Sequence, residues 1–179
     1  MPRRYRRSRY PITRPLKSTK YSNETYGSVV TITNNTEDTY GRANIQLVPD
    51  IAGTLGTRKV KNFTLRLIPE ETLDDDGSTQ TFDRARIAWL LVYVPEGTNP
   101  SSVQFGTSSP ALSVYEPNQN VIMSGLVDSN QCYSFKTRLA RNLSAGDTIA
   151  LILLDLNQPD AGHTITSVVT FEINYAISF

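Results

Sequence analysis

The sequence predicts an all-β body that follows a short basic arm. Strand-like patterns fill most of the chain after the first 25 residues, and no segment of ten or more residues shows a convincing 3.6-residue period. No apolar run approaches the roughly 18 residues that a membrane span needs, so no membrane partner is expected. A chain of 179 residues suits one compact domain with an appendage. We therefore expect an arm at 1–25 and a single domain at 26–179.

The clearest strand is the C-terminal segment TITSVVTFEINYAISF, residues 164–179. Its apolar residues share one parity, with Ser167 as the one polar interruption, and its other parity is mostly polar. This two-residue period indicates a half-buried strand. The segments AWLLVYV (88–94) and TIALILLDL (148–156) are apolar on both parities instead. They are predicted to be central strands whose outer face is covered by long loops or by a neighbouring subunit.

Six further segments bring the candidate strands to nine: GSVVTIT, ANIQLVP, KNFTLRLIP, ALSVYE, NVIMSGLV and CYSFKT. So many strands with almost no helix predict an antiparallel sandwich or barrel, and the jelly roll is the member of that class with about eight strands. An immunoglobulin-like sandwich is the main competitor, but it usually needs fewer residues and lacks support from paired cysteines here. The nearest approach to a helical pattern is TRLARNLSAGD (137–147), which has room for one or two turns.

The arm carries most of the charge asymmetry. Residues 1–20 hold eight of the 18 Arg and Lys and none of the 17 acidic residues, so the rest of the chain is net negative. With so few aliphatic side chains, the arm is expected to be disordered when free. Guanidinium groups donate paired hydrogen bonds to phosphate, and the interleaved tyrosines, with Tyr21, suit stacking on unpaired bases. The predicted nucleic-acid-binding residues are Arg3, Arg4, Tyr5, Arg6, Arg7, Arg9, Tyr10, Arg14, Lys17 and Lys20.

Binding through all eight charges would give a log–log salt slope of about −5 to −6 on a single strand. The competing interpretations of the arm are a nuclear-import signal and a solubilising tail. Nothing in the arm distinguishes DNA from RNA.

The body offers little for catalysis. His163 is a lone loop histidine, and Cys132 in a candidate strand suggests a buried, inert thiol. No nucleophile elbow, phosphate-binding loop or HExxH pattern occurs, so the chain is predicted not to be an enzyme and to need no cofactor or metal. Asp74, Asp75 and Asp76 fit a solvated turn better than a calcium loop. Trp89 is interpreted as a core or interface aromatic rather than part of a sugar-binding face.

Three stretches of the body carry a resemblance to a known family. WLLVYVPEGTNPSS (89–102), LSVYEPNQNVIMSG (112–125) and RLARNLSAGDTIALIL (138–153) cover about a quarter of the chain. Together with the Arg-rich N-terminus, they resemble capsid proteins of small circular Rep-encoding single-stranded DNA viruses, the circovirus- and nanovirus-like group. These motifs are structural and contain no catalytic residues.

The resemblance implies a jelly-roll subunit that assembles into a T=1 icosahedral shell of 60 copies, with the arms inside on a single-stranded DNA genome. It also implies location in the virion, with assembly in the host nucleus or the cytoplasm. Host import factors and an attachment receptor are the further partners, with the loops at 70–80, 95–110 and 157–163 as candidate contact regions. The alternatives are a jelly-roll coat protein of a small satellite-type RNA virus and a monomeric nucleic-acid-binding β domain.

Overall fold

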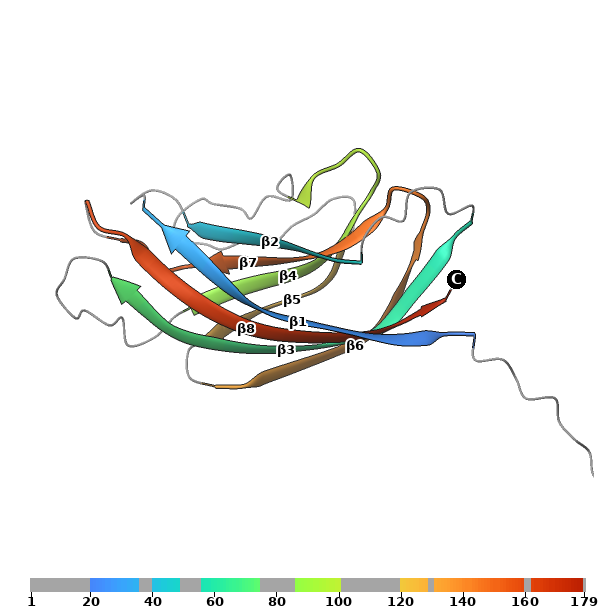
Figure 1. Ribbon diagram of the computed structural model, residues 1–179, viewed down its shortest axis with the longest axis horizontal. Helices are drawn as coiled ribbons and strands as arrows, with labels where there is room; N and C mark the ends of the chain where they lie inside the picture. Colours follow the sequence, from blue (N-terminus) through green and yellow to red (C-terminus); the bar gives the residue numbers. More distant parts are fainter. Residues whose placement is uncertain are drawn as a thin grey trace, which may run out of the picture.

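The protein is a β-sandwich of two antiparallel four-stranded sheets (Figure 1). The computed structural model describes residues 20–35, 40–48, 56–74, 86–100, 120–128, 131–159 and 162–178, and in these ranges every regular element is a strand. The predicted all-β class is therefore confirmed. The strands are β1 (Ser22–Asn34), β2 (Gly41–Val48), β3 (Arg58–Asp74), β4 (Arg86–Val94), β5 (Val121–Asp128), β6 (Tyr133–Leu143), β7 (Thr148–Asp155) and β8 (Ile165–Ser178).

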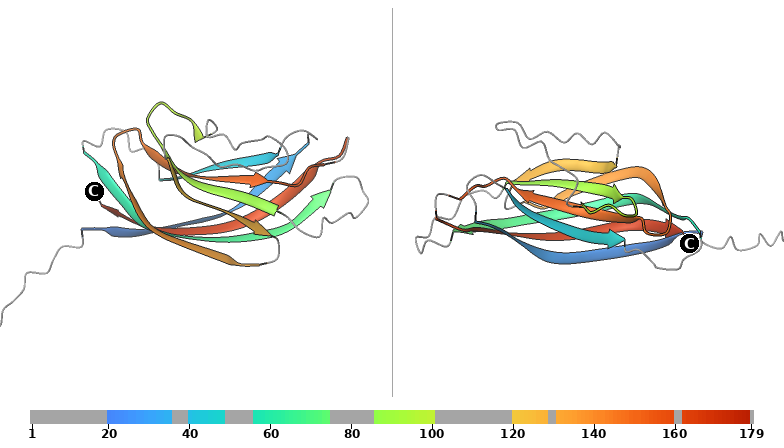
Figure 2. Two further views of the ribbon diagram at one scale, coloured as in Figure 1. Left: turned by 180° about the vertical axis from the view of Figure 1, so that it is seen from behind. Right: turned by 90° about the horizontal axis from the view of Figure 1, so that it is seen from above.

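The two sheets have the strand orders β1-β8-β3-β6 and β2-β7-β4-β5, and they face each other as two layers (Figure 2). Four of the pairings join β1 to β8, β2 to β7, β3 to β6 and β4 to β5, so the two strand numbers always add up to nine. The pairs β3–β8 and β4–β7 complete the sheets. The start of β1 and the end of β8 lie at the same end of the sandwich, because Ser22 pairs with Ile177.

Eight of the nine predicted strand segments coincide with β1 to β8. The ninth, ALSVYE at 111–116, lies outside the described residues, as do residues 1–19 and therefore most of the expected disordered arm. Strand pairing begins at Ser22, earlier than the expected boundary at residue 25.

The segment with the nearest approach to a helical pattern, 137–147, belongs largely to a strand, because β6 continues to Leu143. In the β3–β6 ladder, Lys61 pairs with Ala140 and Phe63 with Thr137, so one residue of β3 faces two of β6. This β-bulge leaves Leu139 half exposed while Leu143 is fully buried. On a regular strand two residues four apart would share a face, so the bulge accounts for the different exposure of the two leucines.

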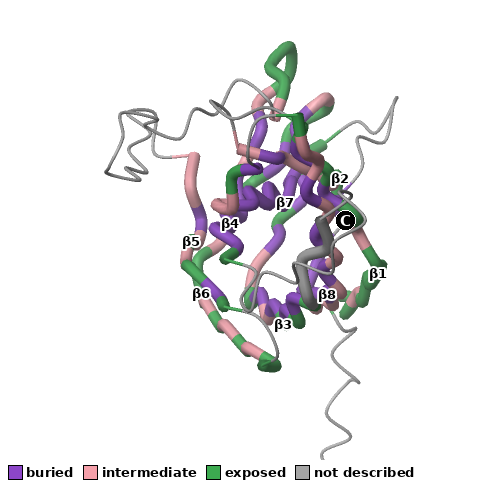
Figure 3. Tube along the Cα trace, turned by 90° about the vertical axis from the view of Figure 1, so that its left-hand side faces the viewer, coloured by how far each residue is buried: buried purple, intermediate pink, exposed green. Residues whose placement is uncertain are grey.

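The strands that are apolar on both parities are central, as predicted: β7 and β4 occupy the middle of their sheet. Figure 3 shows both as buried along nearly their whole length, whereas β1 and β6 expose much of theirs. The main core lies between the sheets, and a second cluster lies on the outer face of the β2-β7-β4-β5 sheet. That cluster is buried within one copy of the chain, with Tyr40, Val121 and Leu156 packed against it.

Trp89 is a core residue, as expected. Its side chain is 1% exposed, and its ring centroid lies 4.6 Å from that of Phe135 on the opposite sheet. Gly125 on β5 faces the indole so closely that an added Cβ would lie 2.9 Å from its ring atoms. Cys132 is exposed and precedes β6, so the buried thiol expected from the sequence is wrong.

Two buried aspartates bracket β7. Asp147, at the end where β1 starts, accepts hydrogen bonds from the Tyr93 hydroxyl (2.7 Å) and from the amides of Ser144 (2.8 Å) and Glu96 (3.0 Å). Burial alone would raise its pKa, but these three donors, with the charge of Arg58, lower the pKa overall. Burial and the bond to Asp147 raise the pKa of Tyr93 to about 12.

Asp155, at the other end of β7, is fully buried and joins the two sheets. Its carboxylate accepts a hydrogen bond from the Ser167 hydroxyl on β8 and another from the Asn157 amide (3.0 Å). Here desolvation outweighs both bonds and raises the pKa. Ser167, the polar interruption in the C-terminal pattern, is therefore the partner of a buried carboxyl.

We predict that Asp155→Asn makes the free energy of unfolding less sensitive to a rise in pH above the usual Asp pKa. A carboxyl with a raised pKa binds a proton more tightly when folded, so its contribution is complete below the usual Asp pKa and is lost as the pH rises through the folded pKa. The asparagine keeps both bonds, because its Oδ1 accepts from Asn157 and its amide donates to a reoriented Ser167 hydroxyl. Urea unfolding between pH 4 and 8 measures the effect. The free energy of unfolding of the variant, relative to that of the wild type, should increase with rising pH by about 1.4 kcal/mol per unit of pKa shift. A constant difference across that range would contradict the prediction.

Candidate nucleic-acid interface

Of the ten residues predicted to bind nucleic acid, the structure describes Lys20, which is exposed directly before β1. The other nine, Arg3, Arg4, Tyr5, Arg6, Arg7, Arg9, Tyr10, Arg14 and Lys17, lie outside the described residues. The geometry therefore locates the point at which the arm joins the body. That point is the beginning of an edge strand of the β1-β8-β3-β6 sheet.

The chain is held against this sheet where the arm ends. The Nζ atom of Lys61 on β3 lies 3.7 Å from the centroid of the Tyr21 ring, which is a cation–π contact. Because β8 lies between β1 and β3, the contact crosses β8, at the level where Lys61 pairs with Ala176. Ala176 and Ser178 are small and buried even though their parity is that of the outer face. Tyr21, one of the tyrosines expected to stack on bases, thus contacts the body.

The outer face of this sheet separates its charges along the strands. The end next to the arm carries Lys59 and Lys61, since the alternate residues Arg58 and Val60 are buried. Further along, Arg66 forms an exposed ion pair with Glu172 at 3.3 Å. The pKa of Glu172 is lowered mainly by the hydrogen bond that Asn174 donates to it and to a smaller extent by the positive charge of Arg66.

Glu70 lies beyond that ion pair and accepts a hydrogen bond from the Thr170 hydroxyl at 3.2 Å. In the described ranges, the acidic side chains of this outer face therefore lie away from the arm. The uncompensated cations lie next to it.

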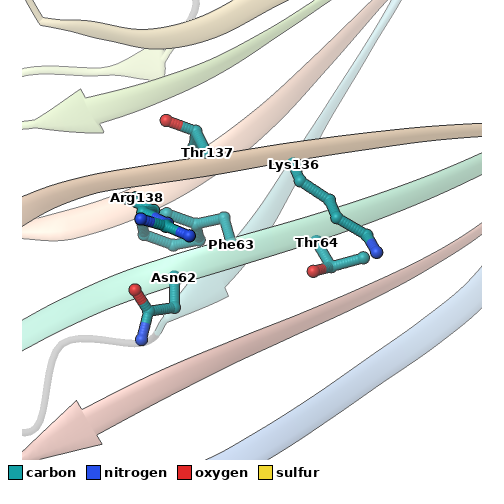
Figure 4. Close-up of a pocket in the computed structure, with 6 residues that line it drawn as sticks. All are labelled: Asn62, Phe63, Thr64, Lys136, Thr137 and Arg138. Atoms are coloured by element: carbon teal, nitrogen blue, oxygen red, sulfur yellow. The ribbon is translucent and has the colours of Figure 1, made fainter.

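A hollow of about 440 Å³ opens on the β3–β6 edge of this sheet, at the bulge. Asn62 takes the left-handed backbone conformation there, with φ of 58°, which Asn tolerates better than most residues. Thr137 accepts a hydrogen bond from the Leu139 amide and so holds the bulged segment. Figure 4 shows Lys136 and Thr64 extending to one side of the strands and Thr137 pointing the other way. The hollow is lined by Asn62, Phe63, Thr64, Lys136, Thr137 and Arg138.

The other candidate sites gain no support. Among the described residues no group of three His, Cys, Asp or Glu could hold a metal ion, and Asp75 and Asp76 lie outside these residues. His163 lies half-buried before β8. No helix in the part of the chain that is described is long and apolar enough to cross a membrane. The absence of an enzyme activity stays a prediction.

Comparison with known proteins adds no assignment. No protein-family model matches the sequence, and no curated protein matches it significantly. What bears on function is therefore the fold and the charge distribution.

Sequence reasoning missed the body residues that continue the positive charge of the arm. Lys59, Lys61, Lys136 and Arg138 are scattered over two segments far apart in the chain, and only the β3–β6 pairing brings them to one face. A partial signal was present, because KVKN and KTR place their cations on alternate residues, as expected for one face of a strand.

Proposed function

We propose that the protein is a capsid subunit that assembles into a small closed shell, of 60 copies, and packages single-stranded DNA through its basic arm. The observation that carries this proposal is the pairing rule of the strands. Antiparallel partners whose numbers add up to nine are expected when one long hairpin of eight strands folds into two sheets, so the pairing supports the jelly roll that many capsid proteins adopt. The cations next to Tyr21 agree with a nucleic-acid role for this end.

Exposed apolar side chains on three of the four edge strands support contacts between copies. Val29 on β1 is 61% exposed, Leu126 on β5 is 55% exposed and Leu139 on β6 is 50% exposed. Single exposed apolar residues are common on monomers. Edge strands, however, are where a sheet can contact another chain, and proteins that stay monomeric usually protect them with charge.

Electron microscopy of the purified full-length protein tests the proposal directly. Closed particles are expected at near-physiological salt, and a stable monomer under these conditions would contradict the shell. The digestion of their contents by deoxyribonuclease, and not by ribonuclease, would support DNA over the satellite-type RNA alternative. The preference for DNA, and for assembly in the host nucleus with import factors, rests on the resemblance of the body to capsid proteins.

We predict that a charge on an exposed edge blocks assembly without unfolding the subunit. Val29→Glu, Leu126→Glu and Leu139→Glu each replace a solvent-exposed group, so each should change the free energy of unfolding by less than about 1 kcal/mol. At least one of them should shift the protein from particle to monomer in gel filtration, because a buried carboxylate without a partner is costly at an interface. Ser134→Glu, at an exposed polar position of β6, is the control. Normal particles from all three variants would show that these edges make no contacts between copies.

A further inference from the structure

The hollow at the β3–β6 bulge has the chemistry of an anion site. Its four outward polar groups are an ammonium, a guanidinium, an amide and a hydroxyl, and all four donate hydrogen bonds. Within the described part of the chain, none of these side chains forms a hydrogen bond or an ion pair. The groups are Lys136, Arg138, Asn62 and Thr64.

We propose that this hollow binds a phosphate group of single-stranded nucleic acid, so that the body continues the binding track that begins in the arm. The inference rests on the proposed function, and it adds a defined site on the folded body. A planar guanidinium can donate two parallel bonds to one phosphate, and Lys136 supplies a second positive charge. A volume of about 440 Å³ lies in the range of pockets that hold small organic ligands, so there is room for a nucleotide.

The position of the hollow favours nucleic acid as its occupant. Asn62, in its wall, directly follows Lys61, whose ammonium group contacts the Tyr21 ring at the end of the arm. A single-stranded nucleic acid that leaves the arm at Lys20 therefore passes Lys61 before it reaches Arg138 on the same sheet. Glu172, an acidic side chain described on this face, is engaged by Arg66 and Asn174. A polyanion on this path therefore meets Lys61 and then the two cations of the hollow.

The salt dependence of binding gives the sharpest test. The probe is a fluorescent 20-nucleotide oligothymidylate, titrated by anisotropy with full-length protein freed of nucleic acid, between 0.1 and 0.4 M NaCl. One phosphate contact contributes about 0.7 to the log–log slope on a single strand, so Lys136→Gln with Arg138→Gln should reduce the slope by about 0.7. At ~0.15 M salt, counterion release then predicts affinity about fourfold weaker. The single variant Arg138→Lys should keep most of the wild-type slope, because lysine keeps the positive charge.

Arg86→Gln is the matched control for Arg138→Gln. Arg86 is an exposed arginine at the start of β4, on the other sheet, and its loss should leave the slope unchanged. A wild-type slope in the double variant would overturn the inference while leaving the packaging function of the arm intact. No binding by the wild type would overturn the proposed function as well. If the double variant binds the oligonucleotide normally but forms no particles, the hollow contacts an acidic surface of a neighbouring copy instead. That result also overturns the inference.

Discussion

Deletion of residues 2–20 is expected to empty the particles of nucleic acid while the β-sandwich still folds. The deletion removes eight positive charges and no strand residue, since β1 begins at Ser22 and the Lys61–Tyr21 contact is retained. Counterion release from eight phosphates at ~0.15 M salt corresponds to between about four and five powers of ten in affinity. The ratio of absorbance at 260 and 280 nm of purified particles measures the loss.

Two variants separate charge from stacking in the arm. Replacement of its six arginines by lysine should retain most of the packaged nucleic acid, because the counterion term depends on charge. Tyr5→Leu with Tyr10→Leu should weaken oligonucleotide binding by about 1–3 kcal/mol per lost stacked base. If the truncated protein packages a normal amount, the arm is not the genome tether.

Asp147→Asn is expected to destabilise the fold by about 1–3 kcal/mol, because a buried amide N–H that the carboxylate accepted is left facing the new side-chain NH₂ group. Two of the three donors to Asp147 are backbone amides, of Ser144 and Glu96, which cannot reverse as a hydroxyl can. One of them must therefore meet the new side-chain NH₂ group. Thermal unfolding should show a fall of about 2–4 °C per kcal/mol for a domain of this size.

The pH dependence gives a second readout for Asp147. A carboxyl with a lowered pKa stabilises the fold above the usual Asp pKa, and this contribution is lost as the pH falls through the folded pKa. The wild type should therefore lose stability in acid more steeply than Asp147→Asn does. Asp155→Asn is the internal control, since the same substitution there meets one amide and one reversible hydroxyl. Equal destabilisation by both substitutions would contradict this account.

The strand content could be predicted because burial follows the sequence pattern closely. In β8 every second residue from Ile165 to Tyr175 is buried, and β4 and β7, apolar on both parities, are covered on both faces. These patterns depend only on neighbours along the strand, which a sequence reveals directly.

Features that depend on pairing between distant strands could not be predicted. Arg138 and Leu139 look like part of a helical turn until the partner strand is known to contribute only Asn62 opposite them. Cys132 looked like a strand residue because CYSFKT alternates, yet the ladder begins one residue later, at Tyr133. The same holds for the candidate site. The arm could be predicted because it is a contiguous run of charge. Its continuation on the body could not, because it depends on the registers of β1, β8, β3 and β6.

The pairing of β1 with β8 also constrains the order of events during synthesis. Among the described strands, β1 is an edge strand that pairs with β8 alone, and the contact between Thr25 and Asn174 joins positions 149 residues apart. Closing so long a loop is slow, and β1 has no partner until β8 has left the ribosome. The inner hairpin of β4 and β5 can form much earlier. The nascent chain therefore keeps its cationic arm attached to an unpaired strand until β8 has been synthesised, so the complete sandwich forms late.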